Sequence, residues 1–241
     1  MREQAMALYV YSIIGAGHPC RLDGLTGVGT EPGTLRTVTT DELCAVVSDV
    51  DEEVRPKRRD LTAHQEVQTS LMADGPVLPL QFGYIAPDEQ TVLEALRQRA
   101  DSYLDSLQRL EGCAEYNVKA SQDEEALLRD ILGEFPEARA LNDRIRGGDT
   151  DPRLPLQLGE LVAAEVRARQ ETLASGLVQA LVGFARDHAV RAPVDGDVLN
   201  LSLLVHDDQK DDFLAAQAGL AEQVEGVAFR FGGPLPPYSF V

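Results

Sequence analysis

The sequence is poor in cysteine and in basic side chains, and both shortages exclude kinds of protein. Cys20, Cys44 and Cys113 are odd in number and far apart, so they provide neither a disulfide framework nor the CxxC spacing of a zinc site. Twenty-two basic against forty acidic residues give a net charge of −18, which repels phosphate backbones and anionic lipid headgroups. We therefore expect no nucleic-acid partner, and a reducing cytoplasm fits best.

Long apolar runs and catalytic motifs are also missing. No segment approaches the roughly 18 to 20 apolar residues that span a membrane, so no membrane association is expected. The sequence has no GxGxxG after a strand, Walker loop, HExxH or GxSxG. The isolated His64 is better interpreted as a packed residue than as a ligand or base. We therefore predict no enzymatic activity, and no catalytic, cofactor-binding or metal-binding residues.

What is present indicates a folded protein of mixed class. The chain has 241 residues, 44% hydrophobic and 26% charged, which is typical of globular proteins and long enough for two domains. Residues 8–14 and 43–50 read as strands around a glycine-rich loop, and residues 60–73 as a helix. Residues 77–85 read as a strand, in which Pro79 marks an edge or a bulge. With a helix that ends at Gly112, residues 1–111 are predicted to form an N-terminal α+β domain.

The second half predicts a different domain. Residues 114–120 alternate apolar with polar side chains such as Glu115, which predicts a strand with one wet face. Helices over residues 123–146 and about 156–188, an Asp195-Gly196 hairpin turn, a further helix and a last strand over residues 227–231 follow. This order is the βαββαβ of a modified ferredoxin-like domain with a long helix, over residues 112–241. The predicted fold class is α+β (mixed α/β) with two domains.

The final residues, 234–241, are here called the tail. Pro234, Pro236 and Pro237 fix φ, so we expect the tail to lie extended, near polyproline II. Tyr238, Phe240 and Val241 would then be apolar anchors for a partner, but packing of these residues against their own domain, as an extension of the last strand, is favoured. A further interpretation, that the PxxP of Pro234 to Pro237 binds an SH3-type domain, rests on the weak evidence of a bare PxxP.

At this point two segments carry a resemblance. "GGPLPPYSFV" resembles the closing G-P-W-P-P-Y-S-F of the gas vesicle GvpL/GvpF family, and "VLPLQFGYI" resembles its V-L-P-V-R-F-G signature. "LYVYSII" and "LQLGELVAAEVRAR" fit the same family. The chain departs from the pattern at Leu235, in place of tryptophan, and at Gln81, in place of arginine. No role is carried over for that indole or guanidinium.

The resemblance implies an accessory protein of gas vesicles, either a minor component or an assembly factor. Such a protein would bind the small hydrophobic shell protein GvpA during nucleation, keep it from aggregating, and contact other accessory proteins at the gas vesicle in the cytoplasm. The partner-binding residues that we expect lie in the two matching segments: Pro79, Phe82, Gly83, Pro234, Pro236, Pro237, Tyr238 and Phe240.

Two rival functions remain at this level. A general protein-interaction module would read polyproline or acidic partners, and the basic run from Arg55 to Arg59 would be its docking patch if it is more than a solvated loop. A small-molecule enzyme on the ferredoxin-like scaffold would need convergent ionisable side chains in one pocket.

Overall fold

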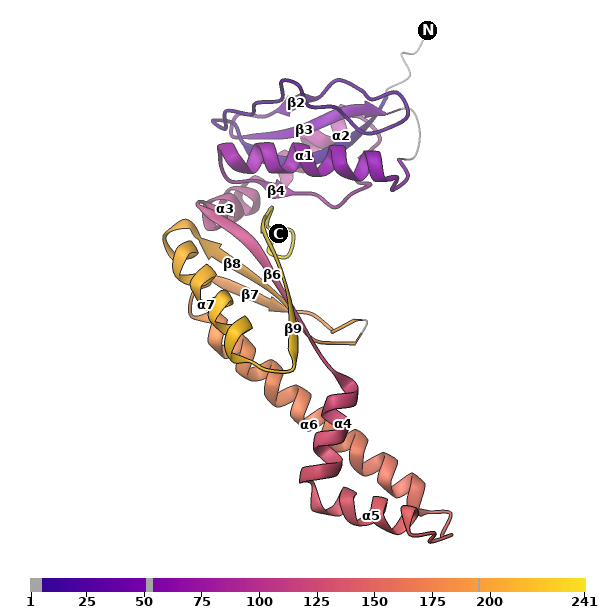
Figure 1. The fold of residues 1–241 in the computed structure, drawn as a ribbon. Coiled ribbons are helices and arrows are strands. Elements are labelled where there is room, and N and C mark those ends of the chain that lie inside the picture. The colour runs from indigo at the N-terminus through magenta and orange to yellow at the C-terminus, as the bar shows by residue number, and fades with distance from the viewer. Residues whose placement is uncertain (1–5, 51–53, 195) are drawn as a thin grey trace. The chain divides into compact units, whose positions relative to one another are not determined.

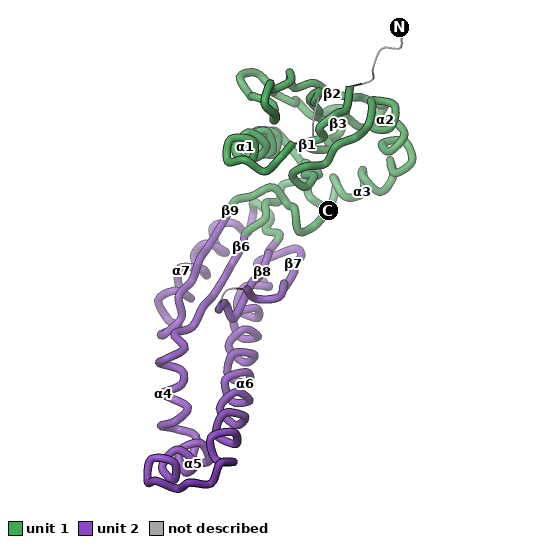
Figure 2. Tube along the Cα trace, turned by 90° about the vertical axis from the view of Figure 1, so that its right-hand side faces the viewer, with its two compact units in different colours: residues 1–116, 204–207, 233–241 green, residues 117–203, 208–232 purple. Residues whose placement is uncertain are grey.

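The computed structural model describes residues 6–50, 54–194 and 196–241 (Figure 1). The chain divides into two compact units (Figure 2). Unit 1 consists of residues 1–116, 204–207 and 233–241, and unit 2 of residues 117–203 and 208–232. Each unit is described below by itself.

Unit 1 is built around an antiparallel sheet of strands β1 (Ala7–Gly15), β2 (Arg36–Thr39), β3 (Leu43–Val50), β4 (Leu78–Pro79) and β5 (Ile85–Ala86). The strand order is β2-β3-β1-β4, and β5 also pairs with β1. The central strand β1 is buried from Leu8 to Ile14, because helices cover both faces of the sheet and both must be apolar.

Helix α1 (Arg58–Asp74) covers one face, where Tyr9, Tyr11 and Val46 pack with Val67 and Leu71. Helices α2 (Glu89–Gln98) and α3 (Ala100–Leu110) cover the other (Figure 1). The predicted single helix is thus two. Helix α2 ends at Gln98, because the next residue, Arg99, has a φ of −118° and a ψ of 20°, which are not helical. Asp88 caps α2 by accepting the backbone N–H of Thr91 at 2.7 Å.

The prediction of one strand over residues 77–85 is wrong in its middle. Two short strands, β4 and β5, flank a turn in which the backbone N–H of Tyr84 donates to the carbonyl of Gln81 at 3.3 Å. Gly83 has a φ of +91°, which explains why the turn needs glycine. Pro79 does lie in an edge strand, as predicted.

Unit 2 and the adjoining strand ends contain β6 (Cys113–Gln122), α4 (Glu124–Glu134), α5 (Pro136–Arg146), α6 (Leu154–Val182), β7 (Asp187–Val190), β8 (Asp197–His206), a short 3₁₀ turn (Asp207–Gln209), α7 (Lys210–Gln223) and β9 (Val227–Leu235). The sheet order is β7-β8-β6-β9. The chain order and the α+β class are confirmed, including the βαββαβ succession.

Two details of this half differ from expectation. The long helix α6 ends at Val182 rather than near residue 188, because Gly183 follows and residues 187–190 form β7. The last strand extends to Leu235 and so takes in Pro234. Strands β7 and β8 are neighbours, as a hairpin requires, although Asp195 of the expected turn lies outside the described residues.

The predicted domain boundary at residue 112 stays a prediction. The two compact units do not coincide with the two predicted domains, because residues 204–207 and 233–241 group with the N-terminal part of the chain (Figure 2). The tail therefore belongs to unit 1.

Gly233, next to the tail, is held too tightly for a side chain. A Cβ there would lie 2.7 Å from Cδ1 of Tyr116 and 2.9 Å from the carbonyl oxygen of Glu115, and its φ is +124°. We expect Gly233→Ala to lower the free energy of unfolding by roughly 2–4 kcal/mol through overpacking and backbone strain. Gly232→Ala is the matched control, because its Cβ would meet only Asn117 at 3.8 Å. Equal urea midpoints for the two variants would contradict this reading.

Candidate functional site

All eight residues expected to bind a partner lie in unit 1. Pro79 is in β4, Phe82 and Gly83 are in the turn after it, and Pro234 is in β9. The other four are in the tail after Leu235, where Pro236, Pro237 and Phe240 are buried and Tyr238 is half-buried. Residues far apart in the sequence are thus brought together.

A group of aromatic side chains joins the two matching segments; we call Tyr9, His64, Phe82 and Tyr238 the His64 cluster, of which Tyr9 and His64 are buried and Phe82 and Tyr238 half-buried. The Tyr9 hydroxyl lies 3.0 Å from Nδ1 of His64, and the Tyr238 hydroxyl lies 3.1 Å from Nε2. The ring of Phe82 contacts His64 and Tyr9 edge-on, with centroids 5.6 and 5.8 Å away. The backbone N–H of Gly83 donates to the Tyr9 hydroxyl at 3.0 Å.

These contacts allow the following proton arrangement. Since the Tyr9 oxygen accepts from Gly83, its own proton can be donated to Nδ1 of His64, and Nε2–H then donates to Tyr238. That tautomer needs a neutral imidazole. Burial lowers the pKa of His64 to about 4, with partial opposition from the carbonyl of Leu80. Burial, with a smaller contribution from the charge of Glu115, raises the pKa of Tyr238 to about 12, so this phenol also stays neutral.

Two charged side chains hold the rest of the tail. Glu115 is buried, and its carboxylate accepts the backbone N–H of Ser239 at 2.8 Å and the hydroxyl of Ser239 at 2.6 Å. The guanidinium of Arg109 donates to the carbonyl of Phe240 at 2.6 Å. Charge-assisted hydrogen bonds of this kind are about twice as strong as neutral ones. The tail is therefore an integral part of unit 1.

The expectation of an extended tail is wrong beyond Leu235. The backbone N–H of Tyr238 donates to the carbonyl of Pro236 at 2.8 Å, and that of Phe240 to Pro237 at 3.1 Å, so the chain turns. The turn brings Ser239 to Glu115 and buries Phe240. The tail does pack against the rest of the chain, as favoured from the sequence, but it does so in a turn and largely against His64 and Arg109 of the N-terminal part, not as an extension of the last strand.

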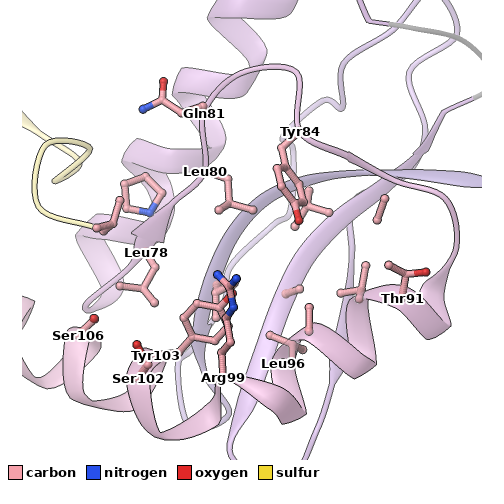
Figure 3. A pocket seen from close by; sticks show the side chains of 18 of the residues that line it. Leu78, Leu80, Gln81, Tyr84, Thr91, Leu96, Arg99, Ser102, Tyr103 and Ser106 are labelled. Atoms are coloured by element: carbon pink, nitrogen blue, oxygen red, sulfur yellow. The ribbon is translucent and has the colours of Figure 1, made fainter.

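An apolar groove of about 460 Å³ lies beside the tail, and residues from both matching segments line it. Figure 3 shows Leu78, Leu80 and Tyr84 projecting toward Leu96 and Tyr103 of α2 and α3. Pro79, Tyr238 and Val241 also line the groove, and Tyr84 and Val241 are exposed. The polar side chains that line the groove are Gln81, Thr91, Arg99, Ser102 and Ser106, and Figure 3 shows the Arg99 guanidinium among the apolar side chains. The groove suits an apolar ligand, because most of its wall offers no hydrogen bond.

Within residues 6–50, 54–194 and 196–241, no three histidine, cysteine, aspartate or glutamate side chains are grouped closely enough to hold a metal ion. In the same part of the chain, every helix is too short or too polar to cross a bilayer.

Sequence reasoning missed the residues that hold the tail. Glu115 was placed on a wet face by its alternation with Ala114 and Tyr116, but it is only 3% exposed because Ser239 covers it. Nothing in the sequence marked Tyr9 or Arg109 as functional, because Tyr9 fits an ordinary apolar strand and Arg109 fits the polar face of an amphipathic helix. The interpretation of His64 as a packed residue is confirmed.

Comparison with known proteins identifies the chain. The sequence profile described as "Gas vesicle synthesis protein GvpL/GvpF" matches residues 7–241. Gas vesicle protein F of Streptomyces sp. (strain CB03234) is 42% identical over 98% of this chain and 100% of that protein. Gas vesicle protein L of the same strain is 27% identical, over 96% and 91%.

Solved structures agree on the fold. The crystal structure of GvpF from Anabaena sp. PCC7120 superimposes with a TM-score of 0.84 at 20% identity, over 98% of both chains. That of GvpF from Microcystis aeruginosa gives 0.80 at 22% identity, over 98% of this chain and 99% of that one. With a family profile that spans nearly the whole sequence and close agreement in fold, this chain belongs to the gas vesicle GvpL/GvpF family.

Proposed function

We propose that this protein is an accessory factor of gas vesicle assembly, which binds the small hydrophobic shell protein GvpA during nucleation and limits its aggregation. It acts by binding and without catalysis, in the cytoplasm and at the gas vesicle, where other accessory proteins are further partners. The observation that carries the proposal is the apolar groove of unit 1 in a member of this family.

The groove has the properties that such a partner requires. An apolar segment of the shell protein would remove the exposed Tyr84 and Val241 and the apolar walls from water, which favours association by roughly 25 cal/mol per Å² buried. The net charge of −18 keeps the carrier itself dispersed while it holds an aggregation-prone segment.

The expected partner-binding residues take two roles in this proposal. Pro79 and Tyr238 line the groove and touch the partner directly. Phe82, Gly83, Pro236, Pro237 and Phe240 act indirectly, because they fix the turn and the tail that form its walls. Pro234 is exposed in β9 and is proposed only as the residue that leads into the tail.

Filling the groove tests the proposal. Ala95 lines it from α2, so Ala95→Trp is expected to reduce co-purification of co-expressed shell protein about tenfold, equivalent to roughly 1.4 kcal/mol. Gln98→Trp adds the same side chain at an exposed position of α2 outside the groove, and is expected to bind like the wild type.

Both variants must fold for the comparison to count. The wild-type chain has no tryptophan, so the tryptophan that each variant gains on α2 is its only one, and its fluorescence reports on unit 1. If Ala95→Trp folds and still captures as much shell protein as Gln98→Trp, the groove is not the binding site.

A further inference from the structure

Strand β9 is an edge strand of unusual length for this protein. The other strands at the ends of the two sheet orders are β2 and β7, with four residues each, and β4, with two. Strand β9 has nine, and in the described part of the chain it pairs only with β6 (Figure 1). Its outer side therefore presents main-chain N–H and C=O groups that no other described strand pairs.

The first five residues of β9, 227–231, lack the features that usually protect an edge. No residue of β9 is buried. Natural edges are blunted by proline, lysine, bulges or short length, yet this segment reads VAFRF, and Pro234 comes only later. Its single charge, Arg230, is already paired with Asp197 at 2.6 Å.

An aromatic pair lies along the same five residues. The rings of Phe229 and Phe231 are stacked, with centroids 5.6 Å apart and planes 4° from parallel, and Phe231 is 40% exposed. Side chains two residues apart point to one face of a strand, where a neighbouring strand would place its own side chains about 5 Å away. Aliphatic or β-branched residues at alternate positions would fit against this pair.

These features indicate what kind of segment would bind at the free edge of β9. A row of alternating donors and acceptors is satisfied by another extended strand rather than by a helix. A second copy of this chain would bring two bodies of net charge −18 together. A strand that is apolar and carries no excess of negative charge meets both conditions.

We propose that residues 227–231 receive a β-strand of the hydrophobic shell protein by edge addition. The proposal rests on the proposed function for the identity of the partner, but it uses a surface of unit 2 that is separate from the groove of unit 1. Pro234 has no N–H to donate, so pairing stops before it.

The test combines hydrogen exchange with capture of co-expressed shell protein. Amides of residues 227–231 in the wild-type protein are expected to exchange at least about tenfold more slowly when the shell protein is bound. A Phe229→Ser/Phe231→Ser double variant is expected to retain about a tenth of the shell protein. Val190→Ser is the matched control, because Val190 is an exposed apolar residue on β7, at the opposite edge of the sheet.

The outcomes separate this proposal from the previous one. Unchanged exchange in β9, or a folded double variant that binds like Val190→Ser, overturns edge addition whatever Ala95→Trp does. If Ala95→Trp loses binding while neither the hydrogen exchange of β9 nor the double variant shows an effect, edge addition fails and only the groove contacts the shell protein. If the wild type forms a dimer and the double variant does not, a second copy of this chain occupies the edge of β9, and the proposal is overturned. If the exchange experiment finds no binding at all, both proposals fail.

Discussion

Phe240→Ala is expected to lower the free energy of unfolding of unit 1 by about 3–5 kcal/mol, as truncation of a buried phenylalanine usually does. Phe240 is 7% exposed, and its loss leaves a cavity at the point where Arg109 and Glu115 hold the tail. Loosening of the tail would add to this cost, because Glu115 would remain buried without its partner Ser239. The tail is thus expected to be among the most sensitive segments of the protein.

Urea unfolding followed by tyrosine fluorescence measures this effect in unit 1 alone. Val241→Ala is the control, since Val241 is 57% exposed and its truncation should change stability by no more than about 0.5 kcal/mol. Equal midpoints for the two variants would mean that the tail does not stabilise unit 1.

Acidification is expected to weaken unit 1 through His64. The pKa of His64 is lowered from 6.5 to about 4 in the folded protein, so between these values the unfolded chain binds more protons. The stabilisation from the neutral imidazole is fully present above pH 6.5 and is lost as the pH falls through about 4. At 1.36 kcal/mol per pKa unit, the loss is roughly 3 kcal/mol.

Comparison of two histidine variants isolates this contribution from that of the many carboxylates. The loss of stability between about pH 7 and about pH 4 should be roughly 3 kcal/mol smaller in His64→Gln than in the wild type. His188→Gln removes an exposed histidine on β7, outside the His64 cluster, and is the control substitution. Parallel pH profiles for wild type and His64→Gln would show that His64 does not titrate with unfolding.

Local patterns were sufficient to predict most of the fold. The spacing of apolar residues predicts these elements: a continuous apolar run predicts β1, alternation predicts β6, and a stripe at helical spacing predicts α1 and α7. Errors arose where a single residue overrides the period, as when Gly83 turns the chain between β4 and β5, or when Arg99 leaves the helical region between α2 and α3.

The site was predictable only in part, because its geometry depends on distant contacts. The sequence indicated Phe82 and Tyr238 through a resemblance, but it could not indicate that His64 joins them. Glu115 looked like a surface residue, and only the position of Ser239 makes it an internal anchor. When a segment more than a hundred residues away buries a polar side chain, the local spacing of apolar and polar residues does not show it.

The bond between His64 and Tyr238 joins residues separated by 174 positions, which has a consequence for biosynthesis. A chain leaving the ribosome presents the β1 sheet and α1 long before residues 233–241 emerge. Until then the His64 cluster lacks Tyr238 and the groove lacks one wall. The nascent protein therefore cannot offer a complete groove, and the binding that we propose for the groove has to wait until residues 238–241 have emerged.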